Sequence, residues 1–226
     1  MNAKFPVITI DGPAASGKSS VSRDLAAKLG WRWVSTGAFY RGLAWVAKQE
    51  KIELNDVKSL VSLCSSDVWS VDLLPEKTAV MWRGKDVSDE IFSDSVGQLA
   101  SQVSQLTEVR KALLQAQRNC ASTGPLVAEG RDCGTVVFPD AILKVFLTAS
   151  EELRAARRAL EQGIALDKIQ ASQRDRDKQD STRTAAPLQA PPDGKVLDTN
   201  HLSLIEAVDM IYGWAKSALG GPTKSL

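Results

Sequence analysis

The chain has 226 residues and a formal net charge of +1, from 28 lysines and arginines against 27 aspartates and glutamates. This balance gives no indication of nucleic acid or a membrane surface as a partner. Three cysteines without metal-type spacing and a single histidine argue against a disulfide framework, a zinc site and a histidine-based catalytic triad. No apolar run approaches the roughly 18 residues needed to span a bilayer, and no signal-peptide pattern precedes the first expected strand. We expect a cytoplasmic protein with one large domain.

A short buried strand is expected over residues 5–10, and it leads into a glycine-rich loop. In that loop a glycine at position 12 is followed, after four intervening residues, by Gly17, Lys18 and Ser19. Loop N–H groups and the positive end of the following helix bind phosphate, so Lys18 is expected to reach the β- and γ-phosphates and Ser19 to ligate Mg²⁺. An ordinary strand-to-helix turn is disfavoured by the Lys-Ser pair and both flanks. The expected nucleotide-binding residues are Gly12, Pro13, Ala14, Ala15, Ser16, Gly17, Lys18, Ser19 and Ser20.

A second strand is expected over residues 31–34, followed by a helix that carries Thr36, Tyr40 and Arg41 near its start. A hydroxyl, a ring and a guanidinium on one helical turn suit a ligand site, although a half-exposed helix start has the same pattern. The β-forming runs at 68–73 and 78–82 then predict a small antiparallel insert, and residues 83–86 are expected to form a turn.

Helical character returns over residues 94–120, where Ser101 and Arg110 are expected on a solvated face. The strand expected at 126–128 ends in a charged cluster that contains Arg131 and Asp132. Ligands of open α/β sheets bind outside the carboxyl ends of strands, so these two residues are candidates for substrate contact, with a solvated turn as the alternative. The apolar face of the 94–120 region is expected to comprise Val109, Leu113, Ala116 and Cys120.

A further buried strand is expected over 141–149, with Ser150 as the cap of the next helix. An arginine-rich tract follows, which by default is solvated and ion-paired. In a phosphoryl-transfer enzyme the same arginines can close over the reacting phosphates. The last expected elements are a strand at 196–198 and a helix that Ser203 and Glu206 begin as a capping box. The arginines of the tract are Arg154, Arg157, Arg158, Arg174, Arg176 and Arg183.

Strand and helix alternation around the glycine loop predicts an α/β protein with a P-loop NTPase fold, in which helices cover both faces of a mostly parallel sheet. The β-rich insert and the arginine tract are excursions from that core. This reasoning indicates a small phosphotransferase and leaves its acceptor open.

Over nearly its whole length the sequence resembles bacterial-type cytidylate kinase. The resemblance rests on residues 10–13, 35–41 and 100–103, and most specifically on the run 129–139 and the segment 176–183 followed by 186–188. Two positions depart from the family pattern: Ser35 stands where relatives often carry Asp, and Cys133 where Ile or Met is usual. Ser35 could weaken a metal-linked or loop-orienting contact.

The resemblance implies a P-loop kinase domain over 1–226, with a core at about 1–62, 109–150 and 185–226, a small β-containing NMP-binding insert at about 63–108 and a helical lid at about 151–184. It also implies ATP as phosphoryl donor with Mg²⁺, CMP and dCMP as acceptors, and a monomer. Within the acceptor site, Ser101, Arg110 and Asp132 would hold the cytosine edge. The implied substrate-binding residues are Thr36, Tyr40, Arg41, Ser101, Arg110, Arg131, Asp132, Arg176, Asp180 and Arg183, and the implied catalytic residues are Lys18, Arg131, Arg157, Arg158, Arg176 and Arg183.

Two alternatives stay open at this point. One is another small P-loop kinase that phosphorylates a different nucleoside monophosphate or a small metabolite such as shikimate. The other is a P-loop switch protein, which the sequence disfavours because it contains no guanine-reading Asn-Lys-x-Asp signature.

Overall fold

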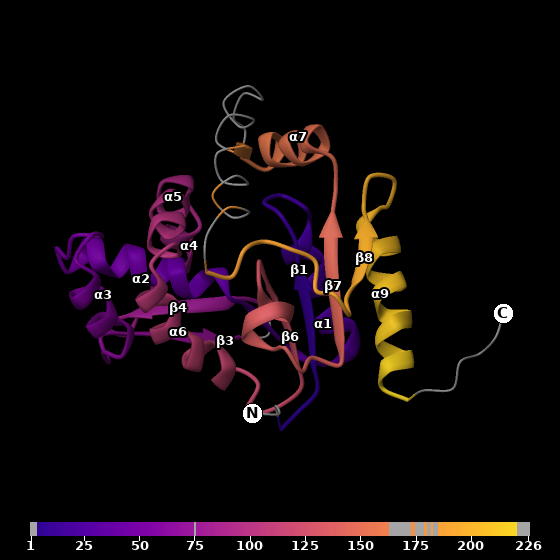
Figure 1. Ribbon diagram of the computed structural model, residues 1–226, viewed down its shortest axis with the longest axis horizontal. Coiled ribbons are helices and arrows are strands. Elements are labelled where there is room, and N and C mark those ends of the chain that lie inside the picture. Colours follow the sequence, from indigo (N-terminus) through magenta and orange to yellow (C-terminus); the bar gives the residue numbers. More distant parts are fainter. Residues whose placement is uncertain are drawn as a thin grey trace.

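The computed structural model describes residues 4–74, 76–162, 173–174, 179, 182 and 185–220. Within these residues the central sheet has five parallel strands in the order β2–β6–β1–β7–β8. The carboxyl ends of all five strands therefore lie along one edge, which Figure 1 shows at the top of the sheet. The strands are β1 (Val7–Asp11), β2 (Arg32–Ser35), β6 (Leu126–Gly130), β7 (Leu143–Thr148) and β8 (Lys195–Asp198).

Two hydrophobic cores lie on the two faces of this sheet, because successive side chains of a strand point to opposite faces. Ile8 and Ile10 of β1 belong to one core and Val7 belongs to the other. The predicted α/β fold, a mostly parallel sheet with helices on both faces, is confirmed. The first core is covered by α1 (Lys18–Leu29) and α9 (Leu204–Ala218), and the second by α2 (Gly37–Gln49), α6 (Thr107–Asn119) and a short π-helical turn, η1 (Cys133–Val137).

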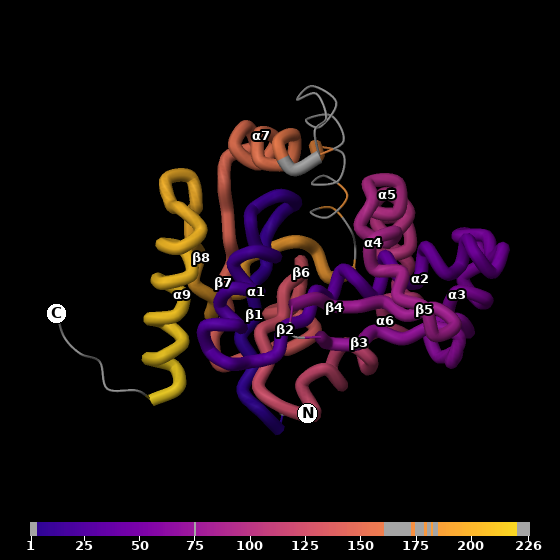
Figure 2. Tube along the Cα trace, turned by 180° about the vertical axis from the view of Figure 1, so that it is seen from behind, coloured from indigo at the N-terminus to yellow at the C-terminus, as the bar shows by residue number. Residues whose placement is uncertain are grey.

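An antiparallel sheet of three strands forms a separate layer beside α2, as expected from the β-rich runs in the sequence. Together with three helices it occupies the end of the molecule opposite to α9 in both Figure 1 and Figure 2. The strands are β3 (Trp69–Leu73), β4 (Thr78–Trp82) and β5 (Lys85–Asp86), and the helices are α3 (Val57–Cys64), α4 (Ser88–Ile91) and α5 (Asp94–Val103).

One further helix, α7 (Glu151–Gln162), lies over the carboxyl edge of the central sheet (Figure 1). Its start is fixed as expected, since the Ser150 hydroxyl accepts the backbone N–H of Leu153 at 3.2 Å. The capping box of α9 is likewise present, with reciprocal bonds between Ser203 and Glu206. No helix in the described ranges combines the length and the apolar character needed to cross a membrane.

Two expectations about local structure are wrong. Ala116 is exposed, and its neighbour Gln117 is buried in its place because the Gln117 amide donates to the carbonyl of Thr36 at 3.4 Å. Residues 85 and 86, expected to belong to a turn, instead pair with β4 as the strand β5.

Candidate active site

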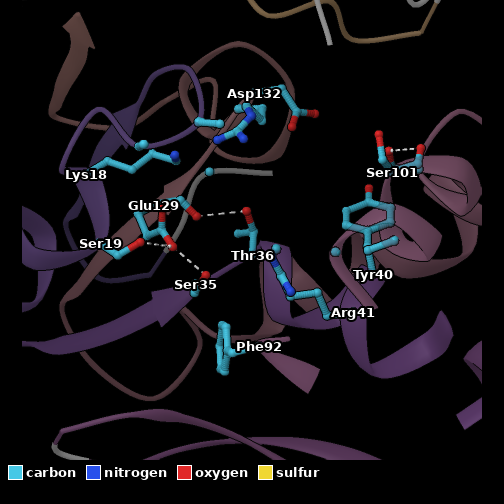
Figure 3. Close-up of a pocket in the computed structure, with 18 of the residues that line it drawn as sticks. Lys18, Ser19, Ser35, Thr36, Tyr40, Arg41, Phe92, Ser101, Glu129 and Asp132 are labelled. Carbon is cyan, nitrogen blue, oxygen red and sulfur yellow. Dashed lines mark hydrogen bonds between the residues drawn. The ribbon is translucent and has the colours of Figure 1, made fainter. Parts of the chain in front are cut away.

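A cavity of about 360 Å³ opens at the carboxyl edge of the central sheet, between the phosphate loop (12–19) and α5. Lys18 and Ser19 lie on one side of it, with Glu129 next to Ser19, and Tyr40 and Ser101 lie on the opposite side (Figure 3). Of the residues predicted for the site, those that line the cavity are Ala14, Ala15, Gly17, Lys18, Ser19, Ser20, Thr36, Tyr40, Arg41, Ser101, Arg110, Arg131, Asp132 and Arg158.

The phosphate loop is shaped by two residues with left-handed backbone conformations, Ala15 at a φ of 57° and Gly17 at a φ of 85°. Gly17 caps α1 and has no side chain with which to satisfy the first backbone N–H groups of the helix, as a capping Ser or Asp would. A helix N-terminus behind such a loop attracts phosphate. Lys18 is only 8% exposed, and its ammonium donates to the carbonyl of Pro13 at 3.0 Å, beside the loop.

A buried carboxylate stands beside the phosphate loop at the end of β6. One oxygen of Glu129, Oε1, accepts the Ser19 hydroxyl at 3.2 Å and also the Ser35 hydroxyl (Figure 3). The other oxygen, Oε2, is buried and has no hydrogen-bond partner in the described part of the chain. A hydroxyl and an unsatisfied carboxylate oxygen are the hard ligands that Mg²⁺ prefers. Sequence reasoning missed Glu129 as a metal candidate, although its place at a strand's carboxyl end was the available signal.

The far wall of the cavity contains an ion pair between Arg110 of α6 and Asp132, which directly precedes η1. Their side chains are 8% and 7% exposed, so both charges are almost completely removed from water. Arg110 also donates to the carbonyl of Ser104 at 3.2 Å, and its guanidinium carbon lies 5.5 Å from the centre of the Tyr40 ring. The expectation that Arg110 lies on a solvated helix face is wrong, because a partner from another element draws it into the interior.

Two other predicted arginines are held by backbone carbonyls at the cavity. Arg131 donates to the carbonyl of Gly12 at 3.0 Å, which ties the end of β6 to the phosphate loop. Arg41 donates to the carbonyls of Ile91 and Ser93 at 2.8 and 3.0 Å.

An aromatic ring that sequence reasoning did not single out also lines this wall. Phe92 is 47% exposed, and its ring centre lies 5.5 Å from the Arg41 guanidinium carbon. An exposed phenylalanine that carries a cation on its face orients that cation at little cost in entropy. Only the fold reveals this role, because no sequence motif brings Phe92 to Arg41.

Contacts from α7 cross the mouth of the cavity. Arg158 forms an ion pair with Asp94 at the start of α5. Arg157 is directed elsewhere, since its guanidinium donates to the hydroxyl and carbonyl of Thr199 at 3.2 and 3.1 Å. Arg154, for which the sequence predicts no role at the site, donates to the phosphate-loop carbonyl of Ala14 at 3.1 Å.

A second contact reaches the cavity wall from the segment after α7. The Ser101 hydroxyl donates to the side-chain oxygen of Gln179 at 2.7 Å. Ser101 therefore lies where the described part of that segment meets α5. Gly12, Pro13 and Ser16 belong to the phosphate loop but do not line the cavity. Arg176, Asp180 and Arg183 lie outside the described residues.

The unusual residue Cys133 fits the interior without entering the cavity. Its sulfur lies 3.4 Å from the Thr36 hydroxyl, and burial raises the pKa of the thiol well above its usual range. The Thr36 hydroxyl also lies 2.9 Å from the carbonyl of Glu129, to which it donates. The thiol therefore stays protonated and acts as a small apolar side chain.

Comparison with known proteins agrees with this geometry. A family model described as cytidylate kinase matches residues 8–217. A cytidylate kinase of Bdellovibrio bacteriovorus is 58% identical over 215 residues, which cover 94% of this chain and 99% of the relative. A cytidylate kinase of Burkholderia multivorans is 45% identical over 222 residues, which cover 96% of this chain and 95% of the relative.

Similar folds also occur among solved structures. An uncharacterized protein from Eubacterium ventriosum has a TM-score of 0.56 at 14% identity, covering 95% of this chain and 99% of its own. A gluconokinase from Sinorhizobium meliloti has a TM-score of 0.51 at 17% identity, covering 97% of each chain. At such low identity these two structures support the fold alone.

Proposed function

The chain belongs to the cytidylate kinase family, and we propose that it transfers the γ-phosphoryl group of ATP to CMP and dCMP, giving ADP with CDP or dCDP. One observation carries the proposal: a phosphate loop and a buried pair of hydrogen-bonding charges, Arg110 and Asp132, face the same cavity. The loop suits the phosphates of the donor. The pair suits the edge of a base, which makes the acceptor a nucleotide.

The reaction requires alignment and positive charge more than proton transfer. The attacking oxygen belongs to the acceptor phosphate, which is already largely deprotonated at pH 7 because the second pKa of a phosphate monoester is about 6. A strong general base is therefore unnecessary. Lys18 and Arg131 lie beside the phosphate loop, Arg158 reaches the cavity from α7, and each brings positive charge to the path of the transferred group.

Base selection follows from matching hydrogen bonds at the far wall. Cytosine offers an exocyclic amine beside two acceptors, N3 and O2. The Asp132 carboxylate suits the amine, the Arg110 guanidinium suits the acceptors, and Ser101 lies on the same wall. Uracil would present a carbonyl to Asp132 and leave buried polar groups unpaired, which such a site rejects strongly. The acceptor phosphate would be held by Arg41 and Arg131, with Thr36 and Tyr40 beside it.

Mg²⁺ is part of the proposal, with Ser19 and Glu129 as the residues that would hold it directly or through its water ligands. The unsatisfied Oε2 of Glu129 and the neighbouring Ser19 hydroxyl support this assignment. When bound between the donor phosphates and these residues, the ion would neutralise phosphate charge. Ser35 would act only by holding the carboxylate of Glu129.

We further propose that the chain is divided into a core, an NMP-binding insert and a lid, as the resemblance implies, and that the lid closes over the cavity. The core comprises about 1–62, 109–150 and 185–226, the NMP-binding insert about 63–108, and the lid about 151–184. The Arg158–Asp94 and Ser101–Gln179 contacts support a lid that meets the insert over the cavity. Closure would exclude water, which competes for the phosphoryl group. The roles expected from the resemblance are kept as proposals: catalysis for Arg157, Arg176 and Arg183, and substrate binding for Arg176, Asp180 and Arg183. To reach the nucleotides, Arg157 would have to break its hydrogen bonds to Thr199.

The proposal includes a monomer and a cytoplasmic location, and three free cysteines support the location. Phosphorus NMR of a mixture of protein, ATP, Mg²⁺ and CMP tests the reaction directly. We expect ADP and CDP to form in equal amounts, and CMP to be left unchanged when the protein is omitted. Consumption of ATP without formation of CDP would contradict the proposed function.

A further inference from the structure

Asp11, a residue with no role in the chemistry above, joins the two halves of the site. It is the last residue of β1 and is 1% exposed. Its two carboxylate oxygens accept the backbone N–H groups of Cys133 and Gly134, each at 2.8 Å. In the opposite direction, Arg131 donates to the carbonyl of Gly12, the residue after Asp11, at 3.0 Å. Three hydrogen bonds therefore fasten the start of the phosphate loop to the acceptor loop (131–134).

Through these bonds, β1 provides the hydrogen-bond acceptors that cap η1, which the acceptor loop does not provide itself. The first N–H groups of a helical turn have no partner within the turn, and the side chain of the preceding residue usually satisfies one of them. Asp132 occupies that preceding position before η1, yet its side chain makes no capping bond. It pairs with Arg110 instead. Asp11 takes over the capping, and the carboxylate of Asp132 is thereby directed to the cavity wall.

Packing around the acceptor loop leaves little room for any other arrangement. A Cβ atom on Gly134 would lie 2.7 Å from the Thr9 hydroxyl and 3.3 Å from the Lys144 side chain. The loop is therefore pressed against β1 and β7, and the Asp11 carboxylate fills the space opposite its two N–H groups. Charge at this place is costly, since burial raises the pKa of Asp11 to about 6 even though both backbone bonds lower it. Stability alone would favour a neutral acceptor here.

We propose that Asp11 is a positioning residue for base selection, which holds Asp132 toward Arg110 and fixes the acceptor loop relative to the phosphate loop. This inference rests on the proposed function. Replacing Asp11 by Asn leaves one acceptor for two N–H groups and turns an amide donor toward the second. Asp132 can then rotate to cap η1 itself, and Arg110 loses the partner that orients it. Selection between cytosine and uracil should suffer, although Asp11 touches neither base.

The test compares the wild type, Asp11→Asn and the matched surface control Asp209→Asn, whose carboxylate pairs with the exposed Lys28. For each protein kcat and KM are measured with CMP and with UMP at saturating ATP, and KM is measured for ATP. We expect Asp11→Asn to lower the CMP-to-UMP ratio of kcat/KM by tenfold or more and to change KM for ATP less than about threefold. The Asp209→Asn control should have the wild-type CMP-to-UMP ratio of kcat/KM and the wild-type KM for ATP.

Two outcomes overturn the inference. If Asp11→Asn keeps the wild-type CMP-to-UMP ratio, Asp11 does not position Asp132. If Asp11→Asn does not fold, Asp11→Ser is measured in its place, and failure of both variants to fold would reduce Asp11 to a purely structural residue. Failure of the proposed function is distinguishable from these results, because the wild type itself would then show no preference for CMP.

Discussion

Arg110 and Asp132 form an ion pair in which neither side chain is more than 8% exposed, on the wall of a cavity whose opposite side is a phosphate loop. Burying two charges costs several kcal/mol per ion, and well-packed apolar residues are often as stable in their place. The pair is therefore better explained by recognition of a ligand than by stability. A ligand that offers both a donor and acceptors replaces the solvation that the pair has lost.

Asp132→Ala should reduce base selection more than turnover. The variant removes the carboxylate that would accept a hydrogen bond from the amine of cytosine. We therefore expect the CMP-to-UMP ratio of kcat/KM to fall by about 10- to 100-fold, or roughly 1–3 kcal/mol. The free energy of unfolding should fall by about 3 kcal/mol, because the Arg110 charge stays buried. Steady-state kinetics with both acceptors and denaturant unfolding measure the two effects. An unchanged ratio would remove Asp132 from the base site.

Lys18→Ala should abolish turnover with every acceptor. Its ammonium lies beside the loop that would bind the donor phosphates, and loss of such a group costs about 10³-fold or more in kcat. The fold should persist, since the Lys18 ammonium donates to a loop carbonyl and not to a core element. Lys28→Ala, which removes an exposed lysine of the same helix, serves as the control. Residual activity above about a tenth of the wild type would refute the assignment.

Glu129→Gln should weaken metal binding. The amide removes the charge of the unsatisfied oxygen beside Ser19, so we expect the Mg²⁺ concentration for half-maximal activity to rise about 10-fold or more. Ser35→Ala should have a smaller effect of the same sign, because the hydroxyl only orients the carboxylate. Titration of Mn²⁺ in the presence of ATP, followed by electron paramagnetic resonance, reads out metal binding without turnover. Equal metal affinity in all three proteins would exclude Glu129 from the metal site.

Phe92→Ala should raise the KM for CMP about threefold to tenfold, with a smaller change in kcat. The ring lies over the face of Arg41 and limits the orientations of the guanidinium that we expect to bind the acceptor phosphate. Phe92→Tyr keeps an aromatic face and should restore the wild-type KM. If Phe92→Ala and Phe92→Tyr have the same KM, the stacking contact has no role in acceptor binding.

The free energy of unfolding should depend on pH through the ionisation of Asp11. Its pKa is raised from 3.8 to about 6 in the folded protein, chiefly by burial. The folded state binds this proton more tightly than the unfolded state, so the contribution to stability is greatest below pH 3.8 and is lost as the pH rises through about 6. The difference in unfolding free energy between wild type and Asp11→Asn should therefore fall by about 2 kcal/mol from pH 4 to pH 7. A pH-independent difference would contradict the raised pKa.

The parts that sequence alone predicts are those specified by neighbouring residues. The phosphate loop follows from glycine and lysine spacing between a strand and a helix, and the capping box at Ser203 follows from a four-residue pattern. Strands buried on both faces, such as β1 and β6, consist mainly of apolar residues before their charged ends. These signals need no knowledge of tertiary contacts.

The parts that sequence does not predict depend on partners from other elements. Helical periodicity places Arg110 on a polar face, and its burial is explained only by Asp132, 22 residues further along the chain. Gln117 is buried because the carbonyl of Thr36 accepts from its amide, a contact 81 residues apart. The link from Asp11 to the acceptor loop likewise joins residues 122 and 123 positions apart.

The measurement that tests the account most directly is the rate of ADP release with ATP and Mg²⁺, compared for CMP, dCMP, UMP, AMP and no acceptor. The account predicts fast release with CMP or dCMP and slow release with the others. Equal release with every acceptor, or release that needs none, would leave the phosphate loop in place and contradict the assignment of Arg110 and Asp132 to the base of the acceptor.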